Sequence, residues 1–155
     1  MIVESQVNIK GSKERIWEVV TNIENASETI QGIEKVEILD RPDDGLVGLK
    51  WRETRTMFGK TATEDMWITE SAENEFYKTR AESHGSIYKT TIAISGQGDD
   101  NTLSMTFEGE AQSIVAKVLS TLMGFMFKGS MRKLLVKDLN DIKAAVERQG
   151  TDDPA

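Results

Sequence analysis

A change of hydrophobic period near residue 113 is the sequence feature that most constrains the fold of this chain. Between residues 47 and 111, apolar and polar side chains alternate in short runs, which is typical of half-buried strands. From residue 113 to about residue 148, apolar side chains recur at helical spacing instead. A sheet must cover its apolar face, and this helical segment is the one long apolar cover that the sequence offers. We therefore expect a curved sheet wrapped around a long C-terminal helix, with room for a pocket between them.

The strand-like runs follow one another at short intervals, which predicts an antiparallel meander. The breaks between them carry turn residues: Gly59-Lys60, Glu73-Asn74, His84-Gly85 and residues 96–101. Seven runs are predicted as strands: 2–9, 33–39, 47–58, 61–71, 75–83, 86–95 and 102–111. After the first run, Ser12 is a good helix N-cap, and a second short helix is predicted from Asn25 to Ile30. The predicted order is β-α-α-β6-α, an α+β fold.

Composition limits the functional classes. With 155 residues the chain suits one domain, predicted over residues 1–148 and followed by a disordered tail at 149–155. The net charge of −7 argues against nucleic acid as a partner. Because there is no cysteine and His84 is the single histidine, neither a metal nor another cofactor is expected. The absence of cysteine fits a reducing compartment, so a cytoplasmic location is predicted. No signal peptide and no transmembrane segment are expected.

A turn at Gly59-Lys60 would place Arg55 opposite Glu64 and Trp51 opposite Ile68. The more apolar face of this hairpin is predicted to face inward, and it holds Trp51, Glu53, Arg55, Met57, Ala62, Glu64, Met66 and Ile68. Trp67 falls on the outer face. The same alternation turns Tyr77, Thr79, Ala81, Tyr88, Thr90, Ile92, Ile94, Leu103, Met105 and Phe107 inward on the later strands.

Three charged side chains, Glu53, Arg55 and Glu64, therefore lie on the predicted inner face. A buried unpaired charge costs several kcal/mol, so these groups are expected to pair with one another. They form either a polar anchor for the head group of a ligand or an ion network that satisfies itself. A carboxylate with a raised pKa in such a place could serve as a general base, which makes Glu53 and Glu64 candidate catalytic residues. The hydroxyl of Tyr88 is the third candidate group.

The predicted ligand-binding residues combine the inner face with the apolar side of the long helix. They are Trp51, Glu53, Arg55, Met57, Glu64, Met66, Tyr77, Tyr88, Ile92, Met105, Phe107, Leu119, Leu122, Met123 and Met126. The helical members are rich in methionine, which adapts to irregular shapes, although they could equally be ordinary core. A second apolar stripe begins at Met131 on another side of the helix, and Gly129 between the two stripes predicts a kink or break.

Three strings carry a resemblance to a known family: Gly11 to Asn22 after the first strand, Trp51 to Glu70, and Leu134 to Lys143. Their order and spacing resemble the START-like superfamily, also called the Bet v 1-like or SRPBCC helix-grip fold, in its polyketide cyclase/dehydrase and lipid-transport branch. This resemblance implies a hydrophobic cavity. It does not imply one reaction, because the superfamily includes carriers, receptors and cyclases.

Three functions therefore remain open. The first is a non-enzymatic carrier of a small hydrophobic or amphipathic ligand, lipid-like or aromatic. The second is a cyclase or dehydratase that uses a glutamate or tyrosine of the pocket. The third is a protein-interaction module with a collapsed pocket, which would lack a cavity of about 300 Å³ or more. The chain is expected to be a monomer or a homodimer.

Overall fold

The computed structural model describes residues 1–57, 59–83, 85–111 and 114–152, with the side chains of 111–127 and 149–152 excluded. The elements are β1 (Ile2–Lys10), α1 (Lys13–Thr21), η1 (Ile23–Asn25), α2 (Ala26–Thr29), β2 (Ile33–Asp40), β3 (Lys50–Met57), β4 (Lys60–Ala72), β5 (Phe76–Ser83), β6 (Ser86–Gln97), β7 (Asp100–Ala111) and α3 (Ile114–Asp152). This order confirms the predicted α+β arrangement, with the short 3-10 helix η1 as an addition.

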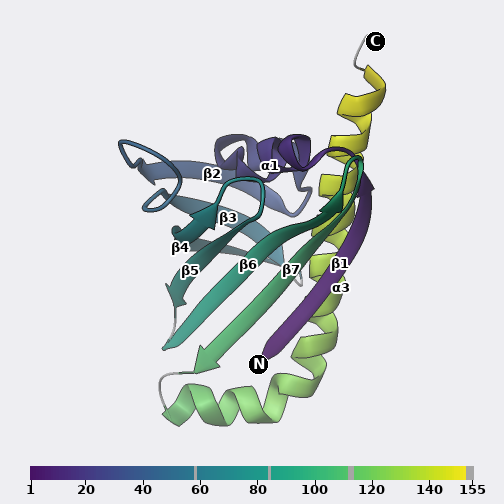
Figure 1. Cartoon of the computed structure of the whole chain (residues 1–155). Coiled ribbons are helices and arrows are strands. Elements are labelled where there is room, and N and C mark those ends of the chain that lie inside the picture. Colours follow the sequence, from purple (N-terminus) through teal and green to yellow (C-terminus); the bar gives the residue numbers. More distant parts are fainter. Residues whose placement is uncertain (58, 84, 112–113, 153–155) are drawn as a thin grey trace.

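The strands form one antiparallel sheet in the order β1-β7-β6-β5-β4-β3-β2 (Figure 1). From β2 to β7 each strand lies beside its sequence neighbour, as expected of a meander joined by short turns. The first strand is the exception, because β1 pairs with β7, the last strand of the chain. The edges of the sheet are therefore β1 and β2.

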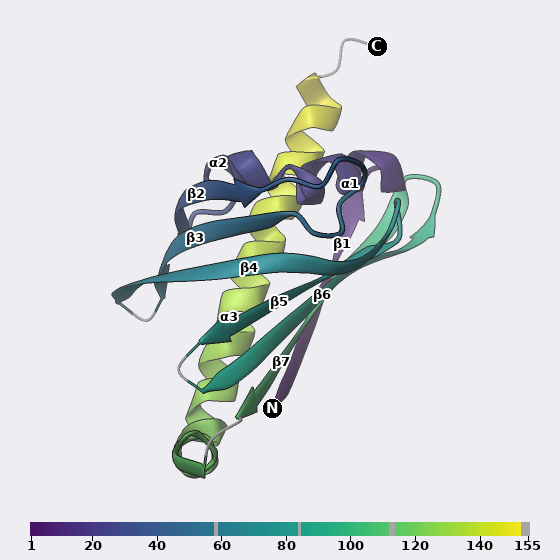
Figure 2. The same cartoon turned by 90° about the vertical axis from the view of Figure 1, so that its left-hand side faces the viewer.

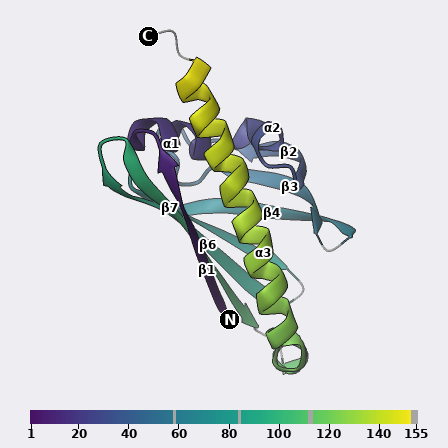
Figure 3. The ribbon, with the colours of Figure 1, turned by 90° about the vertical axis from the view of Figure 1, so that its right-hand side faces the viewer.

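Helix α3 lies against one face of this sheet. In Figure 2 the strands pass in front of the helix, and in the opposite view of Figure 3 the helix stands in front of the strands. Its inward side chains, including Leu135, Leu139 and Val146, belong to one buried cluster with Ile9 and Leu103 of the sheet. The predicted helix-grip fold is confirmed by this packing.

Helix α3 is continuous through Gly129, so the break considered there does not form. Its first turns nevertheless run crosswise to its remaining length (Figure 1). The helix ends at Asp152, four residues beyond the predicted limit of residue 148. The division into a domain of residues 1–148 and a disordered tail stays a prediction.

Helix α1 begins where the sequence predicts. The Ser12 hydroxyl accepts a hydrogen bond from the backbone N–H of Arg15 at 3.2 Å, which satisfies one of the free donors of the first turn. Ile16 and Val20 are buried on its inner side. Together with η1 and α2, this helix packs beside β2 and α3 and so closes one end of the space between helix and sheet (Figure 1).

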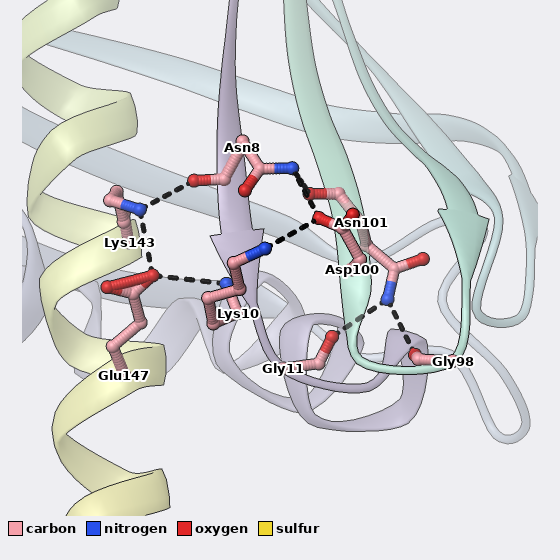
Figure 4. A network of polar contacts seen from close by, with 8 residues as sticks. All are labelled: Asn8, Lys10, Gly11, Gly98, Asp100, Asn101, Lys143 and Glu147. Atoms are coloured by element: carbon pink, nitrogen blue, oxygen red, sulfur yellow. Dashed lines mark hydrogen bonds and ion pairs between the residues drawn. The ribbon is translucent and has the colours of Figure 1, made fainter.

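A polar network joins the β6–β7 hairpin to β1 and α3 (Figure 4). Asn101 has no exposed surface, and its side-chain amide donates to the carbonyl oxygens of Gly11 at 2.8 Å and Gly98 at 2.9 Å. Lys143 of α3 donates to the carbonyl of Asn8 at 2.7 Å. The Asn101 bonds tie the hairpin to the end of β1 and satisfy a buried amide, and the exposed Lys143 bond ties α3 to the same strand.

The hairpin of this network depends on Gly96, whose φ of +127° is a conformation that L side chains rarely adopt. A Cβ there would lie 2.5 Å from the carbonyl oxygen of Asp100. We expect Gly96→Ala to lower the free energy of unfolding by about 1–3 kcal/mol in a urea titration. The matched control is Gly98→Ala, where φ is +60° and a Cβ meets nothing within 4 Å. A loss at position 98 as large as that at position 96 would contradict this explanation.

The predicted register of the β3–β4 hairpin is wrong by two residues. Met57 lies opposite Lys60, which leaves positions 58 and 59 between the strands, and Glu53 rather than Arg55 lies opposite Glu64. Lys60 belongs to β4 and is not part of the turn. Because side chains alternate with a period of two, a shift of two residues leaves every side chain on its predicted face.

Candidate functional site

A cavity of about 400 Å³ lies between the sheet, α3 and the N-terminal helices. Strands β3 to β7 supply its floor, and one side of α3 contributes Met131, Leu134, Leu135, Asp138 and Ile142. Helices α1 and α2, with η1 and the start of β2, close it through Val19, Val20, Asn22, Ile23, Ala26, Thr29, Ile30 and Ile33. Most of these side chains are apolar, which is typical of small-molecule sites.

Eleven of the predicted ligand-binding residues line this cavity: Trp51, Glu53, Arg55, Met57, Glu64, Met66, Tyr77, Tyr88, Ile92, Met105 and Phe107. The alternation of each strand brings them together, since every second side chain of β3 to β7 points to the same face. Four others, Leu119, Leu122, Met123 and Met126, belong to the part of α3 whose side chains lie outside the described residues. His84 also lies outside them.

The charged groups inside are held differently from the prediction. Arg55 donates through Nη1 to Oδ2 of Asp138 at 2.9 Å and through Nε to Oε2 of Glu53 at 3.3 Å. The exposed fractions of the Arg55, Glu53 and Asp138 side chains are 14%, 13% and 8%, so the pairs are largely withdrawn from water. Glu64 lines the same cavity, but Arg55 faces Ala62 across the hairpin. The expected pairing of Arg55 with Glu53 is confirmed, and Asp138 is a second partner that was not predicted.

Burial and charge act against each other in this cluster. Burial alone would lower the pKa of the Arg55 guanidinium, but the charges of Asp138 and Glu53 and their hydrogen bonds raise it. Burial raises the pKa of the Asp138 carboxyl, the charges of Glu53 and Asp141 add to this, and attraction to Arg55 only partly opposes it. The other carboxylate oxygen of Asp138, Oδ1, is buried without a hydrogen-bond partner. Asp138 is therefore the least satisfied group of the cluster.

Asp138 was missed as a site residue, although the sequence holds a signal for it. It follows Leu134 by four residues and precedes Ile142 by four, so it lies on the apolar side of α3. A charged residue inside an apolar helical stripe is normally paired, because an isolated buried charge is costly. That signal predicts a partner but does not name it, since the rotation of the helix against the sheet is unknown before folding.

Tyr77 lines the cavity with its ring rather than offering its hydroxyl to a ligand. The hydroxyl donates to the backbone carbonyl of Val20 at 2.9 Å, and the ring meets Trp17 edge-on at 6.0 Å. Burial, together with the charge of Glu53, raises the pKa of this phenol. Tyr77 thus links β5 to α1 as a neutral hydrogen-bond donor.

Asp138 predicts a pH dependence with a defined sign. Between its ordinary pKa of 3.8 and its raised folded value, the folded state binds more protons than the unfolded state, so its contribution to stability falls as pH rises. The unfolding free energy of the wild type minus that of Asp138→Asn should be largest below about pH 4 and then fall by up to about 1.4 kcal/mol per pH unit.

Asp65 gives the opposite sign and serves as the control. A hydrogen bond from Arg52 holds the pKa of Asp65 below its ordinary value, so its contribution is present above about pH 4 and is lost on acidification. Urea titrations of Asp138→Asn and Asp65→Asn from pH 3 to pH 7 compare the two. Parallel pH profiles for the two differences would contradict the assignment.

No helix of the described part of the chain combines the length and the apolar character needed to cross a membrane.

Several solved structures share this architecture. The protein TTHA0849 from Thermus thermophilus has a TM-score of 0.79 at 15% identity, with 96% of this chain and 99% of that chain covered. A START superfamily protein from Mycobacterium smegmatis has a TM-score of 0.79 at 21% identity, with coverage of 96% and 98%. The Zhui aromatase/cyclase from Streptomyces sp. R1128 has a TM-score of 0.77 at 19% identity, with coverage of 97% and 95%. At these identities the likeness shows the fold.

Sequence comparison with curated proteins gives no match. The family described as polyketide cyclase / dehydrase and lipid transport, in contrast, matches residues 1–147, which include every element from β1 to β7 and the cavity-lining part of α3. This chain therefore belongs to the polyketide cyclase / dehydrase and lipid transport family.

Proposed function

We propose that this protein binds and carries a small amphipathic molecule in the cavity between α3 and the sheet. The observation that carries the proposal is an apolar cavity of about 400 Å³ with one compact polar cluster, Glu53, Arg55 and Asp138, in its wall. Specific small-molecule sites combine an apolar lining with a few placed polar groups in this way. The START superfamily protein and the aromatase/cyclase among the structural neighbours agree with a ligand-binding role.

The volume of the cavity argues against an interaction module with a collapsed pocket. Such a module would lack a cavity of about 300 Å³ or more, the lower end for ligand sites. The described side chains of β3 to β7 and α3 leave about 400 Å³ between them. This space suits a ligand of small to medium size with an apolar body.

The enzymatic alternative has candidates but no assembled acid and base among the described residues. Glu53 accepts from Arg55 at 3.3 Å and weakly from the indole N–H of Trp51 at 3.5 Å, so both of its oxygens are engaged. The ring of Tyr88 stacks on Phe107 with centroids 5.7 Å apart. Each oxygen of Glu53 keeps a further lone pair, so these two contacts hold the carboxylate in place without excluding it as a general base. Catalysis by Glu53, Glu64 or Tyr88 stays a prediction, as do the cytoplasmic location and the oligomeric state.

A large side chain placed inside the cavity should weaken binding. Thr90 lines the cavity on β6, and Thr90→Trp would place an indole in it at a cost of about 1–3 kcal/mol in stability. We expect the neutral fluorescent reporter N-phenyl-1-naphthylamine to bind the wild type and to bind Thr90→Trp at least about tenfold more weakly, a loss of about 1.4 kcal/mol. Native mass spectrometry of freshly purified wild type should also reveal a co-purified small molecule.

Thr91→Trp is the matched control, because Thr91 is the next residue of β6 and points to the other face of the sheet. It adds the same side chain to the same strand outside the cavity. Reporter binding unchanged in Thr91→Trp supports the site. Reporter binding that both variants lose, or neither loses, would argue against it.

A further inference from the structure

We infer that the head group of the ligand is a hydrogen-bond donor without negative charge, an amine before an alcohol, and not a carboxylate or phosphate. This inference deepens the proposed carrier function and depends on it. It concerns the same cavity and rests on which charges the cavity wall holds and which of them are already neutralised.

Negative groups outnumber positive ones in the described lining. In the polar cluster of the cavity wall, two carboxyl groups, of Glu53 and Asp138, share one guanidinium, of Arg55. A buried site strengthens electrostatic interactions, because water no longer screens them well. An anionic head group entering this wall would meet like charges, whereas a cation would be attracted.

The positive charge of Arg55 is already neutralised by its neighbours. Arg55 contacts one carboxylate at 2.9 Å and a second at 3.3 Å, so its positive charge is shared between Asp138 and Glu53. An incoming anion would have to compete with two carboxylates fixed by the fold. In a site built for anions an arginine offers an unoccupied planar fork instead.

An unused acceptor marks the place for a donor. The Asp138 side chain is only 8% exposed, yet its Oδ1 has no hydrogen-bond partner. Leaving a buried acceptor of a charged group without a hydrogen bond is unfavourable. An N–H or O–H of a ligand bound beside Asp138 would supply the missing bond, and an ammonium would add charge to it. Burial raises the pKa of Asp138, and a cationic head group beside it would act in the opposite direction by favouring the charged carboxylate.

The experiment compares three amphiphiles with the same chain and different head groups. Decylamine, 1-decanol and decanoate are titrated at neutral pH, below their aggregation limits, against the wild type loaded with N-phenyl-1-naphthylamine. We expect decylamine to displace the reporter at a concentration at least about tenfold lower than decanoate, with decanol in between. Displacement by decanoate at an equal or lower concentration overturns the inference while leaving the carrier function intact.

Variants on α3 test whether Asp138 causes the preference for decylamine over decanol. Asp138→Asn keeps the size of the side chain and removes its charge, so the preference for decylamine over decanol should disappear. Glu147→Gln, nine residues along the same helix and outside the cavity lining, should leave that preference unchanged. A preference that survives in folded Asp138→Asn overturns the role of Asp138. The ordering in the wild type does not depend on either variant, so it tests the inference even if Asp138→Asn fails to fold.

Two further outcomes distinguish a failure of the inference on the head group from a failure of the proposed carrier function. If the reporter binds but none of the three amphiphiles displaces it, the inference on the head group is overturned. If neither the reporter nor any amphiphile binds, the carrier function itself is overturned.

Discussion

Replacing Arg55 with methionine is expected to lower the free energy of unfolding by about 3–5 kcal/mol. The substitution keeps most of the apolar stem and removes the guanidinium that neutralises Glu53 and Asp138. Both carboxylates would then remain in a largely buried site without a positive partner. Urea titration at neutral pH measures the loss, and the same titration near pH 4 should show a smaller one, because protonation relieves the stranded carboxylates.

Arg52→Met is the matched control on the same strand. Arg52 also makes an ion pair, with Asp65 at 2.8 Å, but 45% of its side chain is exposed. Exposed pairs typically contribute about 0–1 kcal/mol, so we expect a loss of that size. Equal losses from Arg52→Met and Arg55→Met would mean that burial of the inner cluster does not govern its energy.

Leu139→Ala is expected to cost about 2–5 kcal/mol, the range for deleting a buried leucine side chain. Leu139 is 1% exposed and packs in the cluster that joins α3 to the sheet, and it does not line the cavity. The variant therefore tests how much the packing of α3 against the sheet contributes to stability, and it leaves the cavity lining unchanged. Thermal or urea unfolding measures the effect.

Val136 provides the comparison on the same helix, because it is 41% exposed. Val136→Ala removes apolar atoms that already contact water, so a change within about 0.5 kcal/mol is expected. If Val136→Ala were the more damaging of the two, the inward side of α3 would have been assigned to the wrong residues.

The alternation of the strands made the inner face predictable. Trp51, Glu53 and Arg55 point inward as predicted even though the β3–β4 turn was misplaced, because the error of two residues equals the period of a strand. An error of one residue would have inverted the face. Local pattern therefore specifies orientation more securely than it specifies which residues lie opposite each other.

Contacts between segments far apart in the sequence could not be predicted from the alternation of apolar and polar residues. The partner of Arg55 is Asp138, 83 residues further along the chain, and the sequence gives no distance between a strand and a helix packed on it. The same holds for Ile30, which was predicted at the end of a short helix and lines the cavity together with Val20 and Ile23. Their hydrophobicity predicts burial but not the element against which they are buried.

The pairing of β1 with β7 has a consequence for how this chain is made. Val3 lies opposite Phe107 and Ile9 opposite Asn101, so β1 has no partner in the sheet until β7, the last strand, has been synthesised. Contacts between residues this far apart in the chain slow folding, because a long loop must close before they form. Until then β1, with its apolar Val3, Val7 and Ile9 and its free backbone donors and acceptors, is open to pairing with other chains. We therefore expect unfinished chains of this protein to associate most readily through β1.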